Sequence, residues 1–163
     1  MERPASCQLA SFGKLRRMEI FQVDDAGRLY ISPALDEWDA ASQCEIDTVI
    51  DLEGGIDTCI PSLTDHCLYI YFPIADDEDR LPNMTKLRAI ARLAATLIAD
   101  GHRVLSHCGM GYNRSAFMAG LILVELGMPG VEVVARLRER RPGALFNEGF
   151  AACLGGLNPA ATV

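Results

Sequence analysis

Short apolar runs alternate with longer segments of helical periodicity along most of the chain. Four runs predict strands because they are short and rich in β-branched or aromatic side chains, and most of them end at proline or glycine. They cover residues 28–31, 48–52, 68–72 and 103–106. Strands that alternate with helices are typical of an α/β layer architecture. We therefore expect a single α/β domain with a central, mostly parallel sheet of four or five strands flanked by helices.

Four segments predict helices. Apolar residues recur at helical spacing over residues 84–99, and Asp100-Gly101 follows as a stop signal. Residues 115–126 are apolar on nearly every side, which indicates a helix buried at the centre of the domain. Residues 131–141 are amphipathic and precede Pro142, and residues 148–154 are expected to form a last short helix.

The length and composition fit one globular domain. The chain has 163 residues, half of them hydrophobic and 23% charged, so a substantial core is expected. The pattern divides the chain into an N-terminal arm over residues 1–20, a domain over residues 21–156 and a C-terminal tail over residues 157–163. No internal repeat is present.

Charge and cysteine content narrow the classes of partner and the compartment. The 15 Lys and Arg against 22 Asp and Glu give a net charge of −7, which argues against stable binding to nucleic acid or to an anionic membrane. The longest apolar run, residues 116–124, is too short to span a membrane, and no secretory signal is seen. Six dilute cysteines without a CxxC pair favour a reducing cytoplasm.

One segment carries chemistry, and it lies between a predicted strand and the predicted buried helix. It reads His-Cys-Gly-Met-Gly-Tyr-Asn-Arg-Ser over residues 107–115. Backbone N–H groups in such a loop, together with the helix N-terminus, form a natural cradle for phosphate. Gly109 and Gly111 let the backbone turn tightly and approach a ligand. The candidate substrate-binding residues are Gly109, Met110, Gly111, Tyr112, Asn113 and Arg114.

The side chains around this loop suggest a covalent mechanism. The field that binds phosphate also stabilises a thiolate, so Cys108 is a candidate nucleophile. Arg114 has the planar fork that suits two phosphate oxygens and charge stabilisation during transfer. Ser115 is placed to donate to the Cys108 sulfur, and His107 to orient the loop rather than to act as acid or base. Singly these residues are commonplace; together at a strand–loop–helix junction they indicate a phosphate-handling site.

At these residues the sequence resembles the cysteine-based protein tyrosine phosphatases, whose signature is His-Cys, five residues, then Arg-Ser or Arg-Thr. Further segments resemble the dual-specificity branch, namely residues 28–31, 72–76, 141–142 and 147–150, so the likeness covers about residues 27–155. The resemblance implies hydrolysis of phosphomonoesters through a cysteinyl-phosphate intermediate, without metal or cofactor. The implied substrate is a protein or peptide phosphorylated on tyrosine, with serine or threonine also accepted.

The leaving oxygen of such a reaction needs a general acid, because an alkoxide is a poor leaving group. By resemblance this acid, and later the base that activates water, is Asp76. Asp77 follows directly and is the alternative, since a shift of one residue in the loop would exchange the two. Asp76 is favoured. Glu78 and Asp79 read as a solvated acidic turn.

Several residues admit two interpretations. Tyr112 lines the pocket rim or packs, and Asn147 bonds near the loop or caps a helix. Cys59 is a candidate disulfide partner for Cys108 or, more simply, an inert buried thiol. Cys59, His66 and Cys67 lack the spacing of a zinc site, and no metal is assigned.

Alternative functions share the same loop chemistry. An RNA 5′-triphosphatase has a similar loop and would need a basic groove, for which residues 136–141 are the candidates. A phosphoinositide phosphatase is less consistent with a loop that has no basic residue between Gly109 and Asn113. A phosphate-binding module without turnover would result if Asp76 and Asp77 both point away from the loop. Sulfur transfer and arsenate reduction are disfavoured by the acidic loop upstream.

Overall fold

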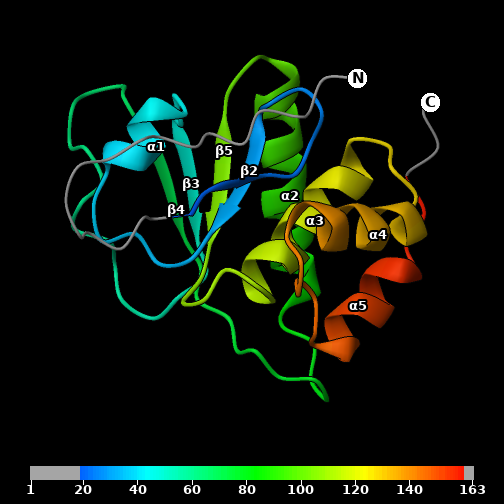
Figure 1. Ribbon diagram of the computed structural model, residues 1–163. Helices are drawn as coiled ribbons and strands as arrows, with labels where there is room; N and C mark the ends of the chain where they lie inside the picture. Colours follow the sequence, from blue (N-terminus) through cyan, green and yellow to red (C-terminus); the bar gives the residue numbers. More distant parts are fainter. Residues whose placement is uncertain (1–18, 160–163) are drawn as a thin grey trace.

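Alternation of side chains along the strands sets up two cores, one on each face of a five-stranded sheet. The computed structural model describes residues 19–159 (Figure 1). The strands are β1 (Phe21–Gln22), β2 (Leu29–Ser32), β3 (Thr48–Asp51), β4 (Leu68–Tyr71) and β5 (Val104–His107). Their order is β1-β2-β5-β3-β4, with β1 antiparallel to β2 and the other pairs parallel. The fold is therefore the single α/β domain that the sequence predicts.

Helices pack unequally on the two faces. The helices are α1 (Asp39–Gln43), α2 (Met84–Ala99), α3 (Arg114–Glu125), α4 (Gly130–Arg140) and α5 (Glu148–Gly155). Four of them, α2 to α5, gather on one face, and the short α1 lies on the other (Figure 1). The α3 helix is the centre of the larger layer, because every residue from Ser115 to Val124 is buried.

The period of two in the strands explains the two cores. Leu29, Ile31 and Ile50 belong to the larger cluster beneath α2 and α3. Their neighbours Tyr30 and Val49 belong to the smaller cluster beneath α1. Strands buried on both faces are typical of a parallel sheet covered by helices on each side.

The register brings three strand ends to one edge of the sheet. His107 pairs with Ser32 of β2 on one side and with Asp51 of β3 on the other. Because parallel strands end at the same edge, the segments that leave β2, β3, β4 and β5 start close together. The segment that follows His107 and the segment that follows Asp51 therefore both begin at this edge.

The predicted strands match β2, β3, β4 and β5 to within one residue at each end, and the bounds of α2 are those predicted. Sequence analysis missed β1 and α1. The first is only two residues long, and the second has five residues and no side-chain cap, so neither leaves a periodic signal.

At the margins of the domain, most of the predicted arm, residues 1–18, lies outside the described residues. Glu19 pairs with Arg141 at 3.3 Å, and Leu157, in the predicted tail, accepts a hydrogen bond from Gly130 N and packs on the core. Across residues 19–159, no helix has the length and apolarity needed to cross a membrane.

Candidate active site

Residues 108–113 connect β5 to α3 and form a loop, two of whose carbonyl groups bond to neighbouring segments. The Gly109 carbonyl accepts from Ala34 N at 3.3 Å, and the Tyr112 carbonyl accepts from Leu145 N at 3.0 Å. Within the part of the chain that the structure describes, no N–H of residues 109–113 donates to a backbone carbonyl. The Gly109 N–H donates to Glu53, and the N–H groups of residues 110–113, together with the N-terminus of α3, are available to an anion.

Gly111 is required by the shape of this loop. Its φ of +72° lies in the left-handed region that favours glycine. A Cβ atom there would lie 2.6 Å from Pro33 N and from the Ser32 carbonyl carbon. Because both of these are backbone atoms after β2, the loop and the end of β2 can approach this closely only without a side chain at position 111.

Cys108 lies at the base of the loop and is 2% exposed. Its Sγ is 3.5 Å from Ser115 Oγ in the first turn of α3, and both residues are buried. The structure thus brings together the predicted nucleophile and the hydroxyl predicted to support it. A hydroxyl at this place can donate to a thiolate.

Arg114 begins α3, and its guanidinium reaches back over the loop. Its Nη2 donates to Glu53 Oε2 at 2.7 Å, and its Nη1 lies 3.4 Å from the carbonyl oxygens of Leu52 and Ile74. Its Nε is buried and has no partner among the described residues. In Arg114, Nη2 is therefore taken by a carboxylate and Nη1 by two carbonyl oxygens, while Nε is left without a partner among the described residues.

Glu53 is a carboxylate that the chain itself holds at the loop of residues 108–113. Burial acts to raise the pKa of Glu53, but the hydrogen bond and charge of Arg114, with the N–H groups of Gly54 and Gly109, hold that pKa below its ordinary value. The contact with the loop is close, because a Cβ at Gly109 would lie 2.5 Å from Glu53 Oε2. Glu53 thus uses donors that a bound phosphate would also use.

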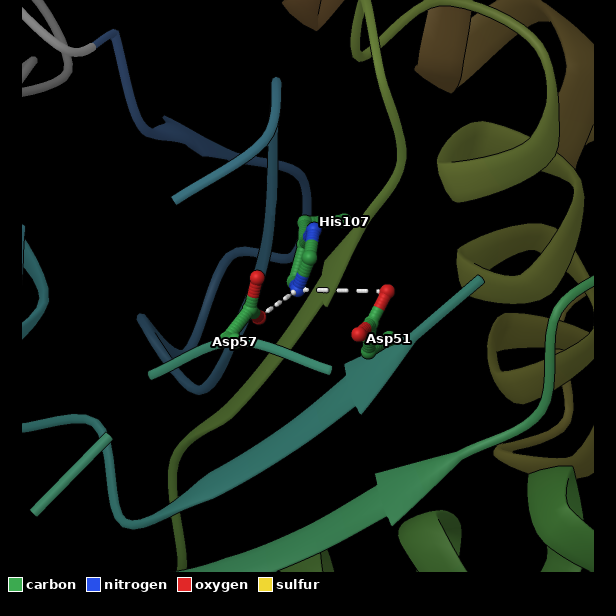
Figure 2. Close-up of side chains that lie close together, drawn as sticks. All are labelled: Asp51, Asp57 and His107. Carbon is green, nitrogen blue, oxygen red and sulfur yellow. Dashed lines mark hydrogen bonds and ion pairs between the residues drawn. The ribbon is translucent and has the colours of Figure 1, made fainter. Parts of the chain in front are cut away.

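His107 is fully buried and lies between two carboxylates (Figure 2). Its Nε2 is 2.6 Å from Asp57 Oδ2 and 3.6 Å from Asp51 Oδ1. Asp51 is the register partner of His107 on β3, which is why both side chains lie on the same face. The other ring nitrogen, Nδ1, has no partner among the described residues. Within the described residues, the side-chain contacts of His107 are therefore made through Nε2, and its role in orienting the loop stays a prediction.

Three hydrogen bonds and the 3.6 Å contact between His107 and Asp51 close into a ring. The Tyr69 hydroxyl donates to Asp51 Oδ2 and accepts from Asp57 N. Burial and the bond to Asp51 raise the pKa of Tyr69, which keeps its proton in place. Burial, reinforced by the charge of Asp51, raises the pKa of Asp57 against the opposing effect of His107.

Asp51, Asp57 and His107 are also the one group of possible metal ligands found within residues 19–159. Their ligand atoms lie within 4.8 Å of one another. Nitrogen and oxygen ligands of one tetrahedral zinc ion lie about 3.3 Å apart, given bonds of about 2.0 Å. The 2.6 Å between His107 Nε2 and Asp57 Oδ2 is instead the length of a direct hydrogen bond. The cluster is thus a hydrogen-bonded support for the residue that precedes Cys108.

Asp76 lies against the loop, and both of its carboxylate oxygens are engaged. Asn113 Nδ2 donates to one oxygen at 2.9 Å and Asn147 Nδ2 to the other at 2.7 Å. Asp77 behaves differently, since its Oδ1 accepts from Asp79 N at 2.9 Å in an exposed turn. Of the two candidate acids, the structure brings Asp76 to the loop and leaves Asp77 in the turn.

The rest of the loop forms its rim. Met110 is 69% exposed beside the cradle. The Tyr112 ring stacks on the Arg141 guanidinium, 4.0 Å from its carbon, and meets Phe146 at 6.2 Å between centroids. Tyr112 thus packs against the segment after α4, which was one of its two interpretations.

The arginines of α4 are paired within the chain. Arg136 and Arg140 both bind Asp25, at 3.0 Å and 2.6 Å. Arg138 contacts the Leu145 carbonyl and Glu148. The arginines that would have to form a basic groove for an RNA substrate are therefore paired with groups of this chain.

Cys59 belongs to the cluster beneath α1, whereas Cys108 belongs to the cluster beneath α2 and α3. The sheet separates these clusters, and both cysteines are free thiols. Burial and the charge of Asp57 raise the pKa of Cys59, as expected for an inert thiol. The geometry thus gives the proposed disulfide no support.

Sequence analysis missed Glu53, Asp51 and Asp57. A signal was present for the first two, since residues 51–53 end a strand predicted to run parallel to the one before Cys108. Acidic residues at the end of that strand are expected to lie near the loop that follows the neighbouring parallel strand. Asp57 had no such signal, because it comes from an irregular segment.

No protein-family model matches this sequence, and no curated protein matches it either. Solved structures do match its fold. The crystal structure of Tk-PTP in the active form is 25% identical with a TM-score of 0.64, over 83% of this chain and 95% of that chain. DUSP15 is 21% identical with a TM-score of 0.70, over 83% and 85% of the two chains. Human DUSP28 is 16% identical with a TM-score of 0.69, over 83% and 89%.

The chain therefore has the fold of the cysteine-based protein tyrosine phosphatase superfamily, in its dual-specificity branch. This confirms the resemblance read from residues 107–115 and the segments around them.

Proposed function

We propose that this protein is a phosphomonoester hydrolase that works through a cysteinyl-phosphate intermediate, most closely a tyrosine or dual-specificity protein phosphatase. The observation that carries the proposal is the meeting of Cys108, Arg114 and Asp76 at one loop with free backbone donors. The phosphatase names of the solved structures with this fold support it.

In the first step, the Cys108 thiolate attacks phosphorus and the bond from phosphorus to the substrate oxygen breaks. Asp76 gives its proton to that oxygen, which leaves as an alcohol or phenol. The loop N–H groups and Arg114 stabilise the charge on the three transferred oxygens. The proposal needs no metal, because these donors supply the positive field.

In the second step, Asp76 accepts a proton from water, whose oxygen attacks phosphorus. The sulfur–phosphorus bond breaks, inorganic phosphate forms, and Cys108 leaves as a thiolate. The Ser115 hydroxyl, 3.5 Å from Sγ, donates to that thiolate as it forms. Asp76 ends the cycle protonated again, so atoms and protons balance.

The alternatives are less well supported. Pairing of Arg136 and Arg140 with Asp25 argues against an RNA 5′-triphosphate as substrate, and the net charge of −7 argues against phosphoinositides. A module that only binds phosphate would have no use for a carboxylate held against the loop. The bonds from Asn113 and Asn147 to Asp76 thus favour turnover over binding alone.

The test compares wild type with Cys108→Ser, with a chelator present, on an aryl phosphate, phosphotyrosine and phosphothreonine peptides, a phosphoinositide and a 5′-triphosphorylated RNA. We expect turnover of phosphopeptides that falls to background in Cys108→Ser, while an oxyanion still binds. Turnover retained in the variant would exclude the covalent mechanism.

Alkylation gives an independent readout of the nucleophile. Burial raises the pKa of Cys67 to about 11 and raises the pKa of Cys59 and Cys153 as well. At pH 8 about one Cys67 in a thousand is then a thiolate. We expect iodoacetate to label Cys108 faster than Cys59, Cys67 and Cys153. Added phosphate should slow the labelling of Cys108 and leave the labelling of the other three unchanged.

A further inference from the structure

We propose that Asn147 is a positioning residue that holds the carboxylate of Asp76 at the phosphate-binding loop, while its own side chain also caps α5. The inference deepens the proposed function and rests on it, because it assigns a residue that acts through the proposed general acid.

The Asn147 side chain has two partners that fix its orientation. Its Oδ1 accepts from Phe150 N at 3.0 Å, which is the N-cap bond of α5. Its Nδ2 donates to Asp76 Oδ1 at 2.7 Å. Exchanging oxygen and nitrogen would set two donors against each other at Phe150 and two acceptors at Asp76, so only one orientation satisfies both.

A second asparagine completes the arrangement. Asn113 Nδ2 donates to Asp76 Oδ2 at 2.9 Å, and Asn113 Oδ1 accepts from Asn147 N at 3.0 Å. Asn113 is 2% exposed and Asn147 is 1% exposed, so water competes little for these bonds. Three hydrogen bonds thus tie together the loop, the start of α5 and Asp76, and a fourth caps α5.

Asp76 itself has little else to hold it. It is exposed, as are the next four residues, and within residues 19–159 its side chain has no hydrogen-bond partner besides the two asparagines. The turn does lie against α5, because a Cβ at Gly149 would lie 2.2 Å from the Glu78 carbonyl oxygen. The start of α5 therefore sets where this turn lies, and the amide of Asn147 sets where the carboxylate points.

This arrangement leaves the acid able to work. Each carboxylate oxygen has two lone pairs, and each accepts one amide donor. The remaining positions can carry the proton and present it to the leaving oxygen. A positioned acid matters most when the leaving group is poor, which defines the signature to measure.

The test separates the cap from the hold on Asp76. In Asn147→Ser the hydroxyl can still cap α5, but it is too short to reach Asp76. The matched control is Asn83→Ser, because Asn83 caps α2 in the same way, accepting from Lys86 N at 3.1 Å, and is exposed. Asn147→Asp is a second variant that keeps a good cap and sets a negative charge against Asp76.

For Asn147→Ser we expect kcat on a phosphate ester with a poor leaving group to fall about tenfold or more, and kcat on nitrophenyl phosphate to fall less than about threefold. Asn147→Asp should lose more on the poor leaving group, and Asn83→Ser should stay within about twofold on both. Equal losses on both substrates would mean structural damage and overturn the inference.

Coupling to Asp76 gives the sharper criterion. In an Asp76→Asn background, Asn147→Ser should cause no further loss on the poor leaving group, because the group it positions is gone. Losses that multiply in the double variant would overturn the role of Asn147.

Hydrogen exchange keeps this inference distinct from the proposed function. Asn147→Ser should speed exchange in residues 76–80, and Asn83→Ser should not. The proposed function would be overturned if the wild type showed no turnover, or only turnover that Cys108→Ser retains. Unchanged exchange in Asn147→Ser would overturn the hold on Asp76 whether or not the wild type turns over substrate.

Discussion

Two loops meet at the same edge of the sheet and are held in opposite ways. Residues 108–113 are fixed by backbone bonds to neighbouring segments and lead into a helix that is buried from Ser115 to Val124. Residues 76–80 are exposed, and the carboxylate of Asp76 is held by two side-chain amides. The difference teaches that the fold alone builds the anion cradle, whereas the position of the acid depends on a few side chains.

The largest effect should come from the exposed loop. We expect Asp76→Asn to lower kcat on a phosphopeptide by about a hundredfold or more, because the leaving oxygen loses its proton donor. Asp77→Asn should stay within about twofold, since among residues 19–159 the Asp77 side chain accepts a bond only from Asp79 N. Steady-state kinetics on both variants decides the matter. A larger loss in Asp77→Asn than in Asp76→Asn would mean that the turn moves by one residue and that Asp77 is the acid.

Substitution in the loop of residues 108–113 should lower the stability of the fold. Gly111→Ala forces a side chain against Pro33 and Ser32, and we expect a loss of about 3 kcal/mol in the free energy of unfolding. Gly127→Ala is the control, because Gly127 also has a positive φ but has nothing within 4 Å of its Cβ position. Its strain alone should cost about 1 kcal/mol. Urea unfolding measures both, and equal losses would show that the close approach at Gly111 does not matter.

The smallest effect concerns Glu53. Removing its charge in Glu53→Gln should lower KM for a phosphate ester severalfold, because Arg114 and Gly109 N–H no longer face a competing anion. A KM that rises would show that Glu53 positions Arg114 rather than competing with substrate.

The same variant tests the pH dependence of stability. Because the pKa of Glu53 is lowered on folding, its contribution is complete above the unfolded pKa and is lost as the pH falls through the lowered folded value. That contribution should be at most about 1 kcal/mol, since the carboxylate is partly exposed. Urea midpoints of wild type and Glu53→Gln should therefore converge in acid and differ at neutral pH. A constant difference across this range would contradict the lowered pKa.

The parts that sequence predicted are those with local signals. The four longer strands have short β-rich runs, α3 has an unbroken apolar run, and the phosphate-binding loop has its glycines and its Cys108–Arg114 spacing. Each of these follows from residues that are close in the chain. The choice of Asp76 over Asp77 as general acid rests on the family resemblance, and it remains a prediction.

The parts that sequence did not predict depend on contacts between distant segments. Asp57 meets His107 across 50 residues, and Glu53 meets Arg114 across 61. Asn147 was left between a helix cap and a contact near the loop, and its amide makes both contacts through different atoms. No local pattern distinguishes such an asparagine from Asn83, which has the cap alone.

The anchoring of α5 has a consequence for partial unfolding. The Phe150 ring stacks on Phe117 of α3 at 4.3 Å between centroids, and this contact, with the buried Ala151 and Leu154, anchors the eight-residue helix that Asn147 caps. If α5 detached as a unit, β5, α3 and the cradle between them would stay together while Asp76 lost one of its two amides. Capacity to bind an oxyanion would then outlast capacity to turn over substrate as denaturant rises. Loss of catalysis would then report the detachment of α5, and loss of anion binding would report the unfolding of β5 and α3.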